Sequence, residues 1–270
     1  MDLPRVSSFS DLDAVRDLAA YVDWLDAARS IEDFRKLKLR MFELMGAAPG
    51  THLLDVGAGT GDDVRALAAL SGPLGRVIGV DISEAMIETA RGRGGPGEFV
   101  VGDAQDLPFP DATFDACRSE RVLAHVADPA RAIGEMFRVV RPGGRVVAME
   151  ADFETLVIDA PDRPLTRRIL NGWCDELRNA WIGRNLYASF RAHAGEATQV
   201  FPITLVMTAF EPANRFWTLE AYCDRMTRIG GLGAAEAARW IESLRHADRE
   251  GRFFCSVTGF VAVGRRPGGA

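Results

Sequence analysis

Residues 51–62 read Thr-His-Leu-Leu-Asp-Val-Gly-Ala-Gly-Thr-Gly-Asp. The apolar first half predicts a β-strand that is covered on both faces, and an acidic residue and three closely spaced glycines follow at its end. Glycine adopts positive φ and lets the backbone approach a bound molecule where a Cβ atom would collide. The stretch therefore indicates a ligand-binding turn that leads into a helix near Asp62, with a tight turn that binds nothing as the alternative.

The spacing of the glycines distinguishes between two kinds of nucleotide-type ligand. The dinucleotide-binding fingerprint is G-x-G-x-x-G, and its helix N-terminus holds a pyrophosphate. Here Gly57, Gly59 and Gly61 give G-x-G-x-G, and the acidic pair Asp62 and Asp63 follows directly. Negative charge at this point is unfavourable for a pyrophosphate but suits a cationic ligand or the helix macrodipole. The spacing therefore disfavours a nicotinamide-dependent oxidoreductase.

Two further predicted strands also lead to a carboxylate. The stretch 76–81 ends in Asp81, twenty residues after Gly61, a separation at which a neighbouring strand tip presents an acid to ribose hydroxyls. Ile82 comes next and would lie flat beside a purine. A third strand, 98–102, precedes Asp103, which can accept a hydrogen bond from an adenine amino group. The alternative for Asp81 is that it only caps the end of its strand.

Five motifs follow one another along the chain: Leu53-Leu54-Asp55-Val56-Gly57-Ala58-Gly59-Thr60-Gly61, Val80-Asp81, Gly102-Asp103-Ala104, Leu107-Pro108-Phe109 with Phe114-Asp115, and Arg141-Pro142-Gly143-Gly144. Their order resembles class I S-adenosylmethionine-dependent methyltransferases, and within them the ubiquinone/menaquinone C-methyltransferase-like branch (type 11). The similarity covers roughly residues 48–152. It implies an α/β, Rossmann-like class I methyltransferase fold: a mostly parallel seven-stranded sheet with an antiparallel last pair, plus helical cap elements.

The resemblance also implies S-adenosyl-L-methionine as the cofactor and S-adenosyl-L-homocysteine as its product. Carried over by position, it assigns Asp55 and the loop 57–61 to the methionine part of the cofactor, Asp81 to the ribose, and Asp103 with Ala104 to the adenine. The expected cofactor-binding residues are Asp55, Gly57, Ala58, Gly59, Thr60, Gly61, Asp81, Ile82, Asp103, Ala104 and Glu120. No metal site is expected, because the cysteines and histidines do not cluster.

The loop after the predicted fourth strand, 113–119, carries the candidate base. The sulfonium of the cofactor is already an activated electrophile, so a base is needed only where the acceptor must lose a proton. His125 aligns with a histidine that is frequent at this point in the resembled family. In some small-molecule O-methyltransferases of this type it acts as base with an acid just after the fifth strand, here Asp152 or Glu150. The alternative is that His125 packs against the following helix.

A chain of 270 residues with 47% hydrophobic content fits a single methyltransferase domain, 1–270. Apolar residues at helical spacing predict two N-terminal helices, and Ser10 can cap the first of them. These residues are Leu12, Val15, Leu18, Val22 and Leu25, then Ile31, Phe34, Leu37, Met41 and Met45. The predicted parts are a helical cap, 1–46, a cofactor-binding core, 47–152, helical insertions, 153–199 and 211–250, and final antiparallel strands, 200–210 and 252–264.

The insertions are rich in aromatic residues that cofactor binding does not require. They carry Trp173, Trp181, Phe216, Trp217, Tyr222 and Met226. As a group these side chains favour a cap over a small, largely apolar or aromatic acceptor that is methylated on oxygen or carbon, although each one alone can simply pack the helices against the sheet. Two alternatives stay open. The fold can retain the cofactor while catalysing a non-methylating reaction such as a cyclisation, or it can serve as a binding module.

Charge and targeting signals narrow the partners and the location. With a formal net charge of −6, the protein repels polyanions, so nucleic acid is not expected as a partner. The first ten residues lack a basic start followed by an apolar run, and no stretch approaches the ~18 apolar residues of a spanning helix. We therefore expect a cytoplasmic monomer or homodimer that binds a small-molecule acceptor and no membrane.

Overall fold

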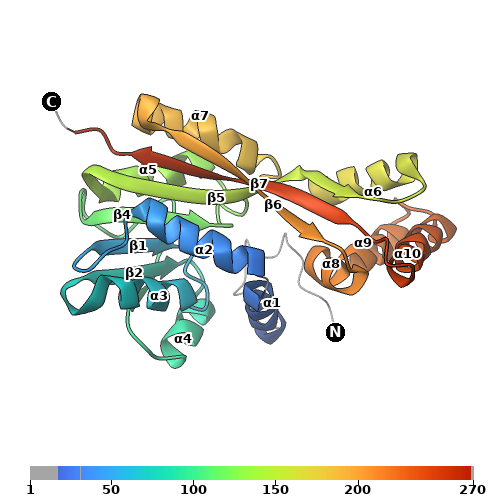
Figure 1. Cartoon of the computed structure of the whole chain (residues 1–270), viewed down its shortest axis with the longest axis horizontal. Helices are drawn as coiled ribbons and strands as arrows, with labels where there is room; N and C mark the ends of the chain where they lie inside the picture. The colour runs from blue at the N-terminus through green and yellow to red at the C-terminus, as the bar shows by residue number, and fades with distance from the viewer. Residues whose placement is uncertain (1–17, 31, 269–270) are drawn as a thin grey trace.

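The computed structural model describes residues 18–30 and 32–268, which form a seven-stranded sheet flanked by helices (Figure 1). The strand order is β3-β2-β1-β4-β5-β7-β6. Strands β1 to β5 are parallel, and β7 runs antiparallel to both β5 and β6. The strands are β1 (His52–Val56), β2 (Arg76–Asp81), β3 (Glu98–Val101), β4 (Phe114–Glu120), β5 (Val140–Ile158), β6 (Gln199–Met207) and β7 (Cys255–Arg265). The predicted fold class is confirmed.

The helices pack around this sheet (Figure 1). They are α1 (Leu18–Ser30), α2 (Glu32–Met45), α3 (Asp62–Ser71), α4 (Glu84–Gly92), α5 (Pro129–Val139), α6 (Arg163–Asp175), α7 (Ile182–Ala194), α8 (Phe210–Trp217), α9 (Leu219–Arg228) and α10 (Ala234–Arg249). Two N-terminal helices are therefore present, as predicted. The predicted cap Ser10 and the helical residues Leu12, Val15 and Ile31 lie outside the described residues.

Strand β5 is much longer than the sequence pattern predicted. The apolar run that marks the fifth strand in the sequence covers only 145–149, whereas β5 runs from Val140 to Ile158 and pairs with β7 along most of its length. The pairing shifts register between Asp152 and Val157, where the Thr155 hydroxyl donates to the Asp152 carbonyl at 2.6 Å. Polar residues around this irregularity break the apolar pattern that marks a buried strand, which is why the extension was missed.

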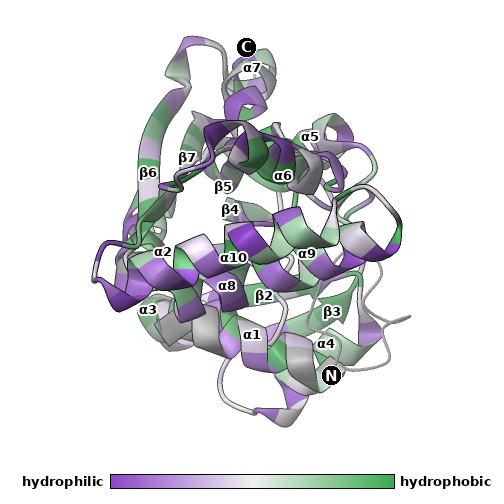
Figure 2. Ribbon diagram, turned by 90° about the vertical axis from the view of Figure 1, so that its right-hand side faces the viewer, coloured by the Kyte–Doolittle hydropathy of each residue, from purple (hydrophilic) through white to green (hydrophobic). Residues whose placement is uncertain are grey.

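The segment between β6 and β7 leaves the sheet and returns to the same place. Met207, the last residue of β6, pairs with Cys255, the first residue of β7, and α8, α9 and α10 lie between them in the chain. In Figure 1 these helices gather with α6 beyond the parallel strands. Figure 2 looks onto α9 and α10 and shows hydrophilic residues interspersed with hydrophobic ones along them. The helices therefore cover one end of the sheet while presenting polar residues to the outside.

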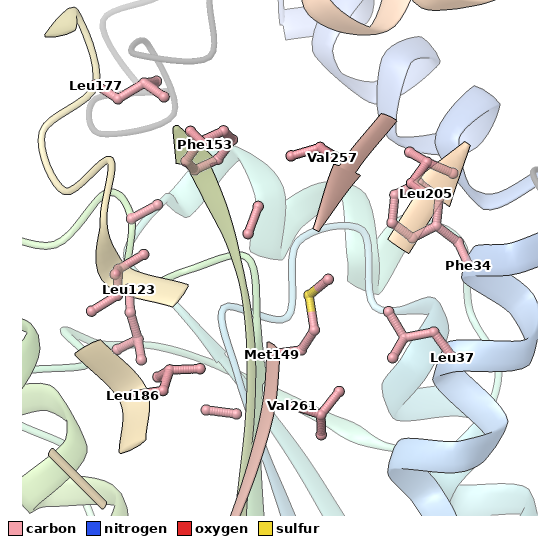
Figure 3. Close-up of a cluster of buried hydrophobic side chains, with 14 of the residues drawn as sticks. Phe34, Leu37, Leu123, Met149, Phe153, Leu177, Leu186, Leu205, Val257 and Val261 are labelled. Atoms are coloured by element: carbon pink, nitrogen blue, oxygen red, sulfur yellow. The ribbon is translucent and has the colours of Figure 1, made fainter. Parts of the chain in front are cut away.

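The hydrophobic core continues from the sheet into these covering helices. Leu53 and Leu54 of β1 are fully buried, as expected for a strand covered on both faces. Side chains from α2 and from the long strands meet around one region, where Phe34 of α2, Met149 of β5 and Leu205 of β6 are buried (Figure 3). Full burial of one such side chain contributes about 1.5–3 kcal/mol. Helix α2 is thus held to the sheet by apolar contact.

Candidate active site

A cavity with a volume of about 260 Å³ lies along the carboxyl edge of the parallel strands. Asp81 and Asp103 line it where β2 and β3 end, and Leu205 and Val257 line it from β6 and β7. Since β3 and β6 are the outermost strands, the cavity extends across the sheet. A smaller cavity, of about 80 Å³, shares part of this lining and includes the loop 57–60. The two together form the candidate site.

The glycine-rich loop adopts the backbone that its sequence predicted. Gly57, Gly59 and Gly61 have φ values of 75°, 51° and 80°, in the region that disfavours other residues. A Cβ atom on Gly57 would overlap the side chain of Val122, in the loop after β4. Gly61 differs from the other two, because it lines neither cavity and a Cβ there would meet Phe99 at 2.5 Å. Its role in this structure is close packing at the start of α3.

The carboxylates predicted at the strand tips lie at one end of the larger cavity. Asp81 accepts from the Gly59 N–H at 2.8 Å and from the Ser83 N–H at 3.0 Å. These bonds tie the glycine loop to the end of β2. Asp103 accepts from the backbone N–H of Gln105 at 2.8 Å. Both carboxylates, and also Gly57, Gly59, Ile82, Ala104 and Glu120, line the larger cavity.

A buried ion-pair network lies behind the glycine loop, and the sequence analysis did not identify it. Arg118 of β4 is fully buried, with Nη1 2.8 Å from Asp63 Oδ2 and 3.3 Å from Asp55 Oδ1, and Nη2 2.5 Å from Glu120 Oε2. Lys38 of α2 also binds Asp63 and lies 3.0 Å from Glu120 Oε2. Helix α2 is therefore joined by charge to α3 and to the end of β4, next to the glycine loop.

The network holds three carboxylates close to two cations, and the pKa values of the three carboxylates are shifted in different directions. Burial raises the pKa of Asp55 to about 7 against the opposing effect of Arg118. Burial also acts to raise the pKa of Asp63 and Glu120, but Arg118 and Lys38 outweigh it and hold both below their usual range. Asp55 is thus the member that gains a proton most readily. Asp55, Ala58 and Thr60 line the smaller cavity only.

His125 lines the larger cavity, as expected for a residue that faces an acceptor. Its pKa is lowered to about 4, first by burial and then by the charges of Arg121 and Arg178. The imidazole is therefore neutral at physiological pH. The acid expected beside His125 would stabilise the charged form of the imidazole, whereas burial and the two arginines oppose that form.

Asp152 was expected beside His125, but the structure places its carboxylate on Arg184 and outside the cavity that His125 lines. Asp152 lies within β5, where Met149, Ala151 and Phe153 line the cavity and the residues between them point to the opposite face. Both Asp152 oxygens bind Arg184 of α7, at 2.5 and 2.8 Å. The carboxylate thus fastens α7 to the back of the sheet.

Glu150, the second candidate acid, is fully buried beneath the loop that carries His125. Its Oε1 accepts from the backbone N–H groups of Val122 and Leu123, at 2.8 and 2.6 Å. Burial raises the pKa of Glu150 to about 7, although the bonds from Leu123 and Val122 oppose the shift. Glu150 therefore fixes the position of the loop 121–125 and does not line the cavity.

Aromatic side chains line the part of the larger cavity beneath α1, α2 and α8. Phe216 packs on Trp24 and Phe34, with ring centroids 5.1 and 5.7 Å apart, and Trp217 stands edge-on to Phe216. Of the six insertion residues singled out in the sequence, only Phe216 and Trp217 line this cavity. The others lie elsewhere: Trp173 and Tyr222 are buried, Met226 packs against the core, and Trp181 is 52% exposed.

The family profile of the methyltransferase domain matches residues 54–148, which contain the glycine loop, both strand-tip carboxylates and His125. The chain belongs to the class I S-adenosylmethionine-dependent methyltransferases. The family implies S-adenosylmethionine as the methyl donor.

Two relatives and one solved structure illustrate this kinship. The methyltransferase is 40% identical over 258 residues to an uncharacterised 37.1 kDa protein in transposon TN4556 of Streptomyces fradiae, covering 93% of this chain and 72% of that protein. It is 45% identical over 109 residues to the demethylmenaquinone methyltransferase of Symbiobacterium thermophilum, covering 38% of this chain and 43% of that one. The crystal structure of the cyclase SpnF has a TM-score of 0.50 at 24% identity, covering 87% and 82% of the two chains, and shares the fold.

The residues of the methyltransferase fit such a donor. Strand-tip carboxylates line one end of the larger cavity, and the smaller cavity has more carboxylates than cations around the loop 57–60, which suits a ligand with a positive charge. Across residues 18–30 and 32–268, no group of three or more His, Cys, Asp or Glu is arranged to hold a metal ion. In that same part of the chain, no helix combines the length and apolar character needed to cross a bilayer.

Proposed function

We propose that the protein transfers the methyl group of S-adenosylmethionine to a small, largely apolar or aromatic acceptor, on oxygen or carbon. One observation carries the proposal: a single cavity joins the carboxylates Asp81 and Asp103 to an aromatic section formed by Phe34, Phe216 and Trp217. Polar groups for a nucleoside and apolar walls for a second molecule thus share one enclosed space.

The cofactor end of the cavity supports the proposed binding roles. An ionised carboxylate offers about four acceptor positions, so the proposed role of Asp81 is to accept from ribose hydroxyls in addition to the N–H groups of Gly59 and Ser83. Asp103 and Ala104 line the side where an adenine would lie, next to the exposed side chain of Ile82. The loop 57–60 borders the smaller cavity, which would take the amino-acid part of the cofactor.

At the acceptor end, the protein has to position the acceptor and exclude water from it. Where the acceptor must lose a proton, the protein also has to remove that proton. The bound cofactor supplies an electrophilic methyl group on a cationic sulfur. Aromatic walls exclude water and orient a flat acceptor. His125 is neutral, and a neutral imidazole has one unprotonated ring nitrogen, which is the atom that would take a proton from an acceptor hydroxyl. Glu150 acts only by holding the loop that carries this histidine.

The experiment is to measure S-adenosylhomocysteine release with a panel of phenols, aromatic carboxylates and activated carbon acids. Release that depends on one acceptor class supports methyl transfer. If the protein binds S-adenosylhomocysteine but no acceptor yields it, the alternative is favoured, namely a cofactor-retaining protein that catalyses a rearrangement such as cyclisation or only binds. The likeness to the cyclase SpnF keeps that alternative in the test. A cytoplasmic location and a monomeric or homodimeric state stay predictions.

A further inference from the structure

Arg121 occupies an unusual backbone position at the junction of the two cavities. Its φ is 58°, in the left-handed region that residues other than glycine seldom adopt. Its N–H donates to the Met149 carbonyl at 2.9 Å, and Glu150 holds the next two N–H groups. Strained positions of this kind cluster at ligand sites, where the surroundings fix them. The loop thus directs the Arg121 side chain into a set position.

The guanidinium of Arg121 lies over two aromatic rings and is short of acceptors. Its Cζ is 4.9 Å from the centroid of Phe34 and 5.7 Å from that of Trp24. Within the described residues, Nε and Nη1 are buried and have no hydrogen-bond acceptor. Glu120 Oε1 is 3.4 Å from Nε without hydrogen-bond geometry, and the other oxygen of Glu120 already binds Lys38 and Arg118. The positive charge of Arg121 is therefore only partly compensated within the protein, while 22% of its side chain stays accessible and lines the larger cavity.

The charged groups that line the larger cavity differ between its two sections. Asp81 and Asp103 lie at the tips of β2 and β3, on the cofactor side. Glu120 also lines the cavity, next to Arg121, and its carboxylate is bound by Lys38 and Arg118. Arg121, His125 and Arg178 line the section toward β5, and His125 is neutral there because its pKa is lowered. Arg178 is exposed and donates to the His125 carbonyl at 3.2 Å. Arg121 is therefore the more enclosed of the two cations.

We propose that Arg121 binds an ionised oxygen of the acceptor, so that the acceptor is a flat apolar or aromatic molecule with an acidic group, such as a carboxylate, phenolate or enolate. This proposal rests on the proposed function and narrows its substrate class. A planar guanidinium in a dry, aromatic setting binds an oxyanion more strongly than it does in water. It also favours the ionised form of the acceptor, which complements the neutral His125 beside it.

The test compares two probes of equal shape, 2-naphthoate and 2-naphthamide, by calorimetry with the protein saturated with S-adenosylhomocysteine. We expect the wild type to bind the carboxylate at least tenfold more tightly than the amide. Arg121→Gln should abolish this preference, and Arg121→Lys should retain part of it. Arg178→Gln is the matched control and should keep the preference, because Arg178 is an exposed cation at the edge of the same cavity.

The outcomes separate this proposal from a structural role and from the proposed function. If Arg121 only clamps α1 and α2 to the loop, Arg121→Gln will lower the Tm and weaken both probes equally. That result overturns the proposal. So does a wild type that binds the carboxylate no more tightly than the amide, both for the naphthalene pair and for the smaller pair benzoate and benzamide. Failure of the wild type to bind S-adenosylhomocysteine would instead overturn the proposed function, and the probe preference would then be measured without it.

Discussion

The two sections of the active-site cavity are built in different ways. The cofactor section comes from strand tips and turns that lie close together in the sequence, and charged side chains and backbone N–H groups hold it in place. The acceptor section combines α1, α2, α8 and the long strands β5 to β7, and apolar and aromatic packing holds it in place. Electrostatics thus shapes one half and tertiary packing shapes the other, so substitutions should affect the two halves differently.

The largest expected effect concerns the charge network behind the cofactor section. Arg118→Leu leaves Asp55, Asp63 and Glu120 with Lys38 as their main remaining cation. Because removing one partner of a buried ion pair leaves uncompensated charge, we expect the free energy of unfolding to fall by about 3–5 kcal/mol. Urea denaturation at neutral pH measures this loss.

The matched control is Arg141→Leu, which removes a partly exposed pair with Asp115 at 2.7 Å. Such a pair contributes at most about 1 kcal/mol. Equal losses for the two variants would show that the network has no special role, and the contrast drawn between the two halves would fail.

The next effect concerns cofactor affinity. Asp81→Ala removes the carboxylate that orders the glycine loop and faces the larger cavity, so we expect S-adenosylmethionine binding to weaken by about 2–3 kcal/mol. Calorimetric titration measures it, with Asp111→Ala, an exposed carboxylate, as the control. Naphthoate binding should stay within a few-fold of the wild type. Unchanged cofactor affinity in a folded Asp81 variant would remove Asp81 from the ribose site.

His125 provides a test on the acceptor side. We expect His125→Ala to lower kcat by about 10- to 100-fold, at or below the lower end of general base catalysis, because a base with a pKa of about 4 is weak. The same pKa means that kcat/KM of the wild type should show no ionisation of His125 between pH 5 and 8. A loss of activity below about pH 7 that disappears in the alanine variant would instead indicate a carboxylate partner.

The last expected effect concerns Glu150 and appears only as a dependence of stability on pH. Its folded pKa of about 7 lies above the unfolded value, so the folded state holds this proton more tightly and stability falls as pH rises through the range 4.5–7. Glu150→Gln keeps an oxygen for the N–H groups of Val122 and Leu123 but carries no charge. We expect its free energy of unfolding to lie within about 1 kcal/mol of the wild-type value near pH 5 and to exceed it by about 3 kcal/mol at pH 8. Urea denaturation at both pH values decides; a variant that is less stable at pH 8 would contradict the prediction.

Sequence patterns predicted the cofactor section better than the acceptor section, and the reason is locality. The glycine loop, Asp81 and Asp103 follow from the chemistry of short turns after buried strands, which neighbouring residues determine. The side chain direction of Asp152 depends on how far β5 extends, and that depends on pairing with β7, about a hundred residues later in the chain.

The ion-pair network was missed for a related reason, since Lys38, Asp63 and Arg118 meet only in the folded protein. One signal was available: Arg118 stands inside the predicted fourth strand, 113–119, and an arginine that is buried in a central strand requires carboxylates nearby. Arg121 gave no such signal, because its left-handed backbone cannot be read from residue type.

The segment α8, α9 and α10 begins and ends at paired residues of β6 and β7, so related enzymes can differ in this segment while they share the sheet. The register of β6 and β7 is set by pairing along the whole of β6, from Gln199 to Met207, so this segment can vary in length while the register is preserved, provided that its buried face still packs on the sheet. The residues that hold Asp81 and the glycine loop lie outside this segment. Grafting this loop from another member of the fold is therefore a direct route to new acceptors, with the methyl donor site inherited unchanged.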